Sequence, residues 1–304
     1  MEGKITFIYA YENEEWSTPL ALAEEFNTRG WDVGIVSIGS NRTQQYDDKN
    51  IQRWLEEEDD SDIVLFMDWG RFDSPFLDKE KLPNAFWIQE SGDDPQNFER
   101  NFPKAEIFHM TLSPDADSTQ EYKSKGINAY WWTHFADTAV QYPIDDINPS
   151  YVAVTSRGIG GSQFLDTLTT HAEGAVGNKN GMGPEEHTTF LNSGQMVIQN
   201  SRWGEVTRRI FEGMACGKMV LCDRLDKSKK LEELFVDGED IVYYDDIVDC
   251  INKMNEYSNN EKERSRIAQN GYDKVIENHT QVQRVDFIIE KFSEWNESQS
   301  AYVY

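Results

Sequence analysis

"QMVIQNSRWGEVTRRIFEGMACGKMVLCD", residues 195–223, has the pattern of a strand, a helix and a second strand. The apolar runs at its two ends are near-continuous, which is typical of strands buried on both faces of a parallel sheet. Between them, Thr207 is placed to be the N-cap of a helix, and Gly217 is placed to end it. The segment therefore predicts a βαβ unit, the building block of parallel α/β domains.

The same alternation continues along most of the chain. Strands are expected at residues 4–10, 31–38, 62–69, 84–90, 105–113, 128–135, 151–156, 173–178, 195–200, 218–223 and 240–245. Helices are expected between them, at residues 17–30, 50–59, 118–126, 164–172, 185–194 and 228–238, and again from residue 247 onward. This order predicts an α/β protein with helices on both faces of parallel sheets.

The chain of 304 residues is long enough for two domains of ordinary size. The acidic, Pro-containing stretch 142–149 is typical of an interdomain linker. We therefore expect a first domain at residues 1–146, a second at 147–280 and a C-terminal helix at 281–304. A ligand of such a pair would bind in a crevice, at the carboxyl ends of the strands.

Composition restricts the classes of partner. The formal net charge of -26 argues against binding to nucleic acid or to an anionic membrane, since both require basic surfaces. The sequence shows no apolar stretch long enough to span a bilayer and no secretion-signal pattern, which predicts a cytoplasmic protein. Three cysteines without metal-ligand spacing fit buried thiols in a reducing compartment. This acidic protein must hold any anion locally.

The helix within the opening segment offers such a local site. Thr207 and the free backbone N–H groups of the first turn would meet an anion, and Arg208 and Arg209 add positive donors suited to phosphate. Glu212, one turn further, is able to accept hydrogen bonds from a ribose diol. The alternative is that Arg208 and Glu212 form a surface ion pair worth about 0.3–0.5 kcal/mol.

A glycine-rich turn follows the first strand of the second domain. In "RGIGGSQ", residues 157–163, Gly160 and Gly161 allow close approach of the backbone to a phosphate, and Arg157 adds a positive charge. The run does not have the G-x-G-x-x-G spacing of dinucleotide-binding proteins. A tight turn with no ligand is the alternative.

Candidate catalytic groups occur in the first domain. Glu90, Asp93 and Asp94 follow a strand, where an acceptor hydroxyl would need a base or an anchor. His134, near the end of another strand, is a further candidate base. In a chain this acidic the carboxylates also fit a solvated loop, and His134 also fits simple packing beside the neighbouring tryptophans.

Three segments carry a resemblance to a known family. "NSRWGEVTRRIFEGMACGKMVLCD", "LEELFVDGEDIVYYDD" and "ERSRIAQNGYDKVIENHTQVQR" together resemble the C-terminal half of the CgeB-like glycosyltransferases, relatives of the retaining GT4 family. The resemblance covers residues 150–290. It implies a GT-B fold, in which two Rossmann-like domains face each other across a crevice. The second domain would hold the nucleotide sugar, the first the acceptor, and the helix after His279 would return to the first domain.

The resemblance also implies roles for individual residues. Glu212 matches the glutamate that binds the ribose, Thr207 lies where the pyrophosphate is held, and Arg209 is the arginine of an R-x-F-E motif. The E-x7-E spacing of GT4 enzymes leads back from Glu212 to Gly204, a departure at the position where those enzymes contact the donor sugar. No metal ion and no cofactor are expected, because arginines and the helix dipole would neutralise the departing diphosphate.

These features predict a hexosyltransferase-like enzyme. It would transfer a sugar from a UDP or GDP sugar to an unidentified glycan, protein or small molecule, and we expect retention of configuration without a metal ion. An inverting reaction would instead need a carboxylate of the first domain or His134 as base. The alternatives are a catalytically impaired nucleotide-sugar-binding protein and a sugar-nucleotide epimerase of the same fold.

Overall fold

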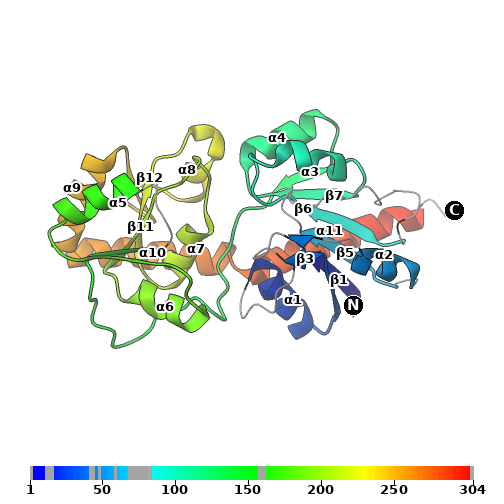
Figure 1. Ribbon diagram of the computed structural model, residues 1–304, viewed down its shortest axis with the longest axis horizontal. Helices are drawn as coiled ribbons and strands as arrows, with labels where there is room; N and C mark the ends of the chain where they lie inside the picture. The colour runs from blue at the N-terminus through cyan, green and yellow to red at the C-terminus, as the bar shows by residue number, and fades with distance from the viewer. Residues whose placement is uncertain are drawn as a thin grey trace. The chain divides into compact units, whose positions relative to one another are not determined.

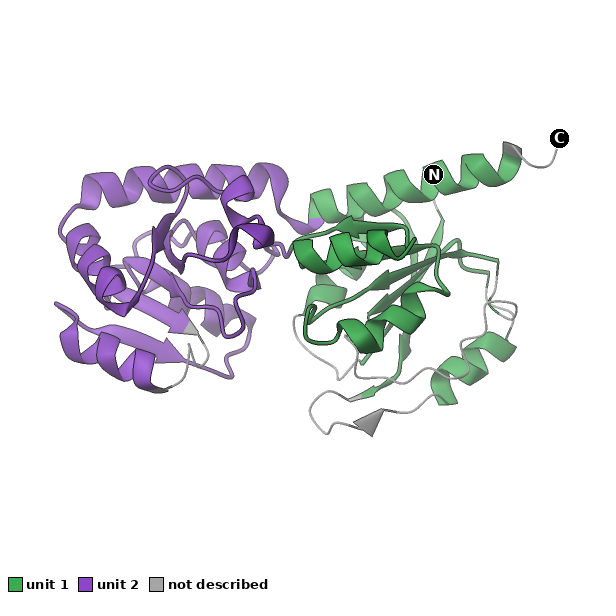
Figure 2. Cartoon of the chain, turned by 90° about the horizontal axis from the view of Figure 1, so that it is seen from above, with its two compact units in different colours: residues 1–133, 282–304 green, residues 134–281 purple. Residues whose placement is uncertain are grey.

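The computed structural model describes a chain of two α/β units. The described residues are 3–10, 17–40, 45–46, 49–57, 60–67, 82, 84–156 and 162–301. The first unit comprises residues 1–133 and 282–304, and the second comprises residues 134–281 (Figure 2). Each unit contains a parallel sheet covered by helices (Figure 1).

The first unit is built on a parallel sheet with the strand order β2-β1-β5-β6-β7-β8. Every residue of β5 and β6 is buried, whereas the edge strand β2 is only partly buried. The strands are β1 (Lys4–Tyr9), β2 (Asp32–Ser37), β5 (Ile63–Met67), β6 (Phe86–Glu90), β7 (Met110–Ser113) and β8 (Ala129–Trp131), with a small antiparallel pair β3 (Gly39–Ser40) and β4 (Gln45–Tyr46). The helices are α1 (Thr18–Thr28), α2 (Lys49–Glu56), α3 (Phe98–Ala105), α4 (Ala116–Ser124) and α11 (Gln281–Ala301).

The last helix, α11, packs on the first unit through aromatic side chains. The ring of Phe292 lies 6.0 Å from that of Trp31, and the ring of Trp295 lies 5.3 Å from that of Phe86. Aromatic pairs at such distances contribute about 0.5–1.5 kcal/mol each beyond the area they bury. Residues 282–304 thus belong to the unit that contains the N-terminus.

The second unit has the strand order β10-β9-β11-β12-β13, with all pairs parallel. Helix α7 packs on this sheet, with Phe211, Met214 and Ala215 completely buried as its core face. The strands are β9 (Ala153–Ser156), β10 (Val176–Lys179), β11 (Met196–Gln199), β12 (Met219–Asp223) and β13 (Val242–Tyr244). The helices are α5 (Ser162–His171), α6 (Pro184–Asn192), α7 (Arg208–Ala215), α8 (Leu231–Leu234), α9 (Ile247–Ser258) and α10 (Glu261–Asn278), with a 3-10 turn at Lys227–Lys229.

The two units divide at residue 133, earlier than the expected boundary at residue 146. The reason is that Ala136 forms a bridge with Thr280, and the Ala136 N–H donates to the His279 carbonyl at 3.0 Å. The expected linker is also fixed to this unit, since Asn192 on α6 donates to the Tyr142 carbonyl. Residues 134–149 therefore pack with the second unit.

Helix α3 is absent from the sequence-based expectations, which assigned no element to residues 98–104 and placed Ala105 in a strand. Its N-cap residue, Asn97, makes no side-chain capping bond, and Pro103 lies inside the helix. Both features are atypical of helices, so the local pattern gave no signal. The helix is stabilised by burial of Phe98, Asn101 and Ala105.

No helix in the described part of the chain combines the length and the apolar character that crossing a bilayer requires.

Candidate functional site

Helix α7 begins directly after an extended residue, Thr207, at the carboxyl edge of the second sheet. Thr207 has φ -108° and ψ 154°, the backbone conformation of an N-cap, yet its side chain makes no capping hydrogen bond. Its Oγ1 is buried and has no partner among the described residues. The Ile210 N–H donates to the Thr207 carbonyl at 3.3 Å. The start of a helix carries a partial positive charge, which favours an anion there. Gly217, with φ 68°, follows the helix and allows the chain to turn into β12.

Arg209 is held in place by the preceding strand. Its Nη1 donates to Oε1 of Gln199, the last residue of β11. Gln199 is 1% exposed, and its Nε2 has no hydrogen-bond partner in the described part of the chain. A buried amide N–H without a partner is costly, so this atom is suited to receive a ligand oxygen. The sequence analysis missed Gln199; the only signal was a polar residue that ends an apolar strand.

Glu212 is buried between two basic side chains. Its Oε1 lies 2.9 Å from Nε of Arg208, one turn earlier on α7, and its Oε2 lies 3.9 Å from Nε2 of His187 on α6. The ion pair between Arg208 and Glu212, considered above as a surface feature, is thus present, but Glu212 is only 7% exposed. Removing one partner of a buried ion pair costs much more stability than breaking a surface pair, because the other charge is left buried without compensation.

His187 and Asp137 complete this cluster, and neither was a candidate from the sequence. Burial lowers the pKa of His187, an effect that nearby Glu212 opposes. Burial raises the pKa of Asp137, with attraction to Arg208 and repulsion from Glu212 as smaller effects. The Asp137 carboxylate accepts a hydrogen bond from the Ala139 N–H at 3.1 Å. Titratable side chains with shifted pKa values that gather around one helix end are typical of functional sites.

The carboxylates of the first unit have different surroundings. Asp94 is 5% exposed and accepts hydrogen bonds from Ser91 at 2.6 Å, Asn101 at 2.9 Å and Ser113 at 3.0 Å. Burial raises the pKa of Asp94 to about 6, although these hydrogen bonds lower it. Glu90, at the end of β6, is also buried, whereas Asp93 is exposed and has φ 60°. The three residues occupy one strand end, but only Asp93 faces solvent.

The remaining predicted residues are placed as follows. His134 is half-buried and is the first residue of the second unit. Arg157, Gly160 and Gly161 lie outside the described residues. Thr207, Arg208, Arg209 and Glu212 are brought together by α7.

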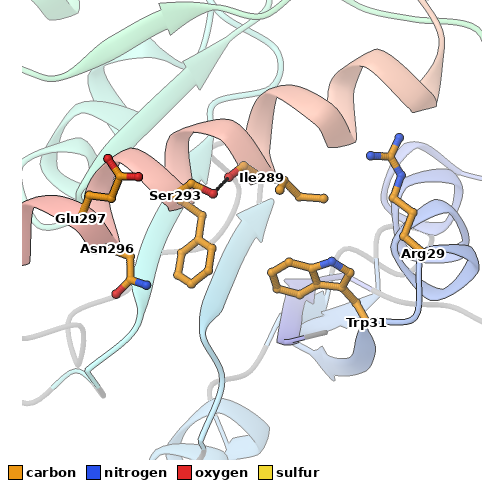
Figure 3. Close-up of a pocket in the computed structure, with 7 residues that line it drawn as sticks. Arg29, Trp31, Ile289, Ser293, Asn296 and Glu297 are labelled. Carbon is orange, nitrogen blue, oxygen red and sulfur yellow. Dashed lines mark hydrogen bonds between the residues drawn. The ribbon is translucent and has the colours of Figure 1, made fainter. Parts of the chain in front are cut away.

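A separate pocket of about 390 Å³ lies in the first unit, between the end of α1, the start of β2 and α11 (Figure 3). Trp31, which lines it, precedes β2 and so lies at the amino end of that strand. None of the predicted site residues that the structure describes lines this pocket. Since ligands of open α/β sheets bind at the carboxyl ends of the strands, the pocket is distinct from the candidate site.

Helix α7 lies within a segment that matches a known protein family. Residues 158–290 match the model of the glycosyl transferase-like family. Comparison with curated proteins gives no match. The family match thus covers α7, Gln199, His187 and part of the glycine-rich turn, but not Asp137.

Solved structures are similar over nearly the whole chain. Sucrose-phosphate synthase from Thermosynechococcus elongatus is 9% identical, with a TM-score of 0.72 over 98% of this chain and 100% of that chain. HepE from Anabaena, in complex with UDP and glucose, is 11% identical, with a TM-score of 0.70 over 96% and 100% of the two chains. A glycosyltransferase from Rickettsia africae is 12% identical, with a TM-score of 0.65 over 96% and 98%.

The chain has a GT-B fold. At such low identities the likeness establishes the fold, and the chemistry must be argued from the residues of this chain.

Proposed function

We propose that the chain is a glycosyltransferase that binds a nucleoside-diphosphate sugar at the N-terminal end of α7. The observation that carries the proposal is the uncapped start of this helix, with Arg209 and Arg208 on its first turn and the buried Glu212 one turn later. The groups that would bind a diphosphate and the carboxylate that would bind a ribose diol thus lie one turn apart on the same short helix. Support also comes from the family match over residues 158–290 and from the fold shared with HepE, a structure that contains UDP and glucose.

The diphosphate would be held by three kinds of interaction. Arg209, oriented by Gln199, would donate to phosphate oxygens, the Thr207 hydroxyl would add a neutral donor, and the positive end of the helix dipole would add its attraction. These interactions would stabilise the negative charge that develops on the departing diphosphate. They would do so without a metal ion, and the protein would need no cofactor.

Glu212 would accept hydrogen bonds from the ribose diol. Its two oxygens face Arg208 and His187, so the diol would have to share the carboxylate with these groups. Arg208 would then turn toward the diphosphate, which offers it a stronger, doubly charged partner.

For the transfer step we propose retention of configuration, as in the GT4 and CgeB-like enzymes that the sequence resembles. The departing phosphate would then accept the proton of the acceptor hydroxyl, and no protein nucleophile is required. This agrees with Asp94, whose carboxylate is occupied by three internal hydrogen bonds. The exposed Asp93 is the first-domain carboxylate that an inverting reaction would use.

Calorimetric titration with UDP and GDP tests the phosphate site. We expect one of them to bind, and we expect Arg209→Gln to weaken binding about 10- to 100-fold, the value of a charge-assisted hydrogen bond. The matched control is Arg266→Gln, since Arg266 is an exposed arginine of the same unit that pairs with Glu263 on α10. Equal affinities of both variants, or no binding of either nucleotide to the natural chain, would rule the proposal out.

Comparison of the ribose and 2′-deoxyribose forms of the nucleotide that binds tests the role of Glu212. The natural chain should prefer the ribose form, and Glu212→Gln should lose that preference because a neutral amide accepts weaker hydrogen bonds. A preference that persists in the variant would assign the diol to other residues.

An impaired binding protein is the second candidate, and Gly204 is the observation that favours it. This residue has φ 70°, lies where GT4 enzymes have a glutamate and carries no side chain to contact a sugar. Release of free sugar from UDP-glucose or GDP-mannose distinguishes the two candidates. Slow release that Arg209→Gln abolishes supports the transferase, whereas tight binding without release supports the binding protein.

A further inference from the structure

The pocket of the first unit has one face of α11 as a wall (Figure 3). The residues of this wall are Ile289, Phe292, Ser293, Asn296 and Glu297, which have the spacing of a single helix face. Because a helix rises about 1.5 Å per residue, the wall is about 12 Å long. The pocket volume of about 390 Å³ lies in the range of small-molecule sites, about 300–1,000 Å³. The pocket therefore has the size for a small organic molecule.

Two of the lining side chains are aromatic and are fixed by their neighbours. Trp31 and Phe292 are 5% and 7% exposed, and their ring centres lie 6.0 Å apart. The ring of Phe26 contacts Trp31, and the ring of Trp295 contacts Phe292. These contacts hold both rings before any ligand arrives, and such preorganisation lowers the entropic cost of binding. An apolar ligand body would pack here with little rearrangement.

Arg29 lies at the opposite end of the pocket from Glu297 (Figure 3), and its donors are already used. Its Nε donates to Glu25 at 2.7 Å, and its Nη1 donates to Asp286. Its Nη2 donates to the Val282 carbonyl at 3.0 Å. One guanidinium thus faces two carboxylates, and an anionic ligand would have to displace one of them. The pocket therefore does not favour an anion.

Glu297 provides a negative charge without a counter-charge. The neighbouring glutamates of α11, Glu290 and Glu294, pair with Lys291. In contrast, no residue in the described part of the chain forms an ion pair or a hydrogen bond with the Glu297 carboxylate. The side chain of Asn296, at the same end of the pocket, adds a neutral acceptor (Figure 3). The lining residues and their ion-pair partners thus comprise three carboxylates and one guanidinium, an excess of negative charge.

We propose that this pocket binds an organic ammonium ion with an apolar body of up to about 12 Å. The ammonium group would donate to Glu297 and Asn296, since charge-assisted hydrogen bonds are the strong ones. The apolar body would pack on Ile289, Trp31 and Phe292. The net charge of -26 would attract such a cation from a distance. This site is independent of the proposed function, because all its residues belong to the first unit and α7 belongs to the second.

The test compares three ligands of similar shape and different charge. These are 2-phenylethylamine, which is a cation, the neutral 2-phenylethanol and the anion 3-phenylpropionate. They are titrated into the natural chain by calorimetry at about 0.15 M salt, which screens the distant charges of this acidic protein. We expect the amine to bind about tenfold more tightly than the alcohol, and the anion not to bind. Failure of the amine to bind, equal affinity for amine and alcohol, or tighter binding of the anion would overturn the proposal.

Two substitutions at exposed positions separate the charge of the pocket from its space. Glu297→Gln should weaken amine binding about tenfold and leave alcohol binding unchanged. The matched control is Glu294→Gln, on the same helix but outside the pocket lining, which should change neither affinity. Ser293→Phe places a ring in the pocket and should abolish binding of both ligands. Thermal unfolding establishes that each variant is folded.

Other results would assign a different site or a different occupant. Equal loss of amine affinity in Glu294→Gln and Glu297→Gln, or full binding to Ser293→Phe, would place the amine outside this pocket. Displacement of the amine by UDP or GDP would place it at the nucleotide site. A change of molar mass in Ser293→Phe, measured by light scattering, would make a second copy of the chain the occupant. Each of these results would overturn the proposal, whereas a chain that binds no nucleotide would leave the amine titrations just as decisive.

Discussion

The carboxyl edges of the two sheets both carry buried acidic side chains, but their partners differ. In the first unit, Asp94 accepts hydrogen bonds from the neutral groups of Ser91, Asn101 and Ser113. In the second unit, Glu212 lies against the guanidinium of Arg208 and near the imidazole of His187. The acidic group is similar in both places, and only the second is matched by a positive charge.

This difference distinguishes a carboxylate that supports the structure from one that belongs to a ligand-binding site. Neutral donors do not recover the full cost of burying a charge, which explains why the pKa of Asp94 is raised to about 6. A basic partner stabilises the carboxylate of Glu212, and the same partner is able to receive a phosphate. The comparison therefore assigns Asp94 to the internal support of its loop and the α7 cluster to binding.

Replacing each carboxylate by its amide should have opposite effects on stability. Glu212→Gln should destabilise the second unit, and Asp94→Asn should stabilise the first unit by a smaller amount. Glu212→Gln removes the ion-pair partner of the partly buried Arg208, and the attraction to Asp137 that remains is weaker. We expect a loss of about 3 kcal/mol in the free energy of unfolding. Urea unfolding at pH 8 measures it. The matched control is Glu263→Gln, which breaks an exposed i,i+3 pair with Arg266 and should cost less than about 0.5 kcal/mol. A similar small cost for both variants would contradict the comparison.

Asp94→Asn should stabilise the first unit at pH 8 by about 1–2 kcal/mol. The raised pKa means that the folded chain holds a proton that the unfolded chain has lost, so stability from this group falls as pH rises from about 4 to about 6. Asparagine removes that loss, and the difference between the two chains should vanish near pH 4. The Oδ1 of Asn101 has no partner among the described residues, so a flip of that amide provides an acceptor for the new N–H.

Thermal unfolding at several pH values measures this effect, with Asp93→Asn as control. Asp93 is exposed on the same loop, and asparagine tolerates its positive φ well. Its substitution should leave the pH dependence unchanged. A destabilised Asp94→Asn chain at pH 8 would show that the carboxylate is needed in its charged form.

The sequence was sufficient to predict the strands of the two parallel sheets and α7, since both follow from local patterns. It began the strand of β7 at residue 105 instead of Met110, and it did not predict the short pair of β3 and β4. Apolar runs marked β5 and β11, and the core face of α7 followed from its helical spacing. Helix α3 was missed because its stability comes from burial and not from caps or helix-forming residues. Local patterns describe an element only where the element is stabilised locally.

The same limit applies to the site. The pair of Arg208 and Glu212 was predictable because residues four apart meet on a helix, but its burial was not. His187, Asp137 and Gln199 come from three other parts of the chain, and no spacing connects them to α7. Their roles depend on the folding of the whole second unit around that helix.

The smallest expected effect concerns the two helix starts of the second unit. Asp246, the N-cap of α9, accepts hydrogen bonds from the N–H groups of Val248 and Asp249, so Asp246→Ala should cost about 1 kcal/mol. Thr207 makes no such bond, and its buried hydroxyl has no partner among the described residues. Thr207→Ala should therefore change the free energy of unfolding by less than about 0.5 kcal/mol.

For nucleotide affinity, Thr207→Ala should have the larger effect of the two substitutions. Thr207→Ala should weaken binding of the free nucleotide about fivefold, through the loss of one neutral hydrogen bond to phosphate, and Asp246→Ala should leave it unchanged. Urea unfolding and calorimetric titration of both variants provide the four values. If Thr207→Ala costs as much stability as Asp246→Ala, the hydroxyl of Thr207 caps α7 in solution. The start of the helix would then be satisfied without a ligand, and the anion site would have to rest on Arg209 and Gln199 alone.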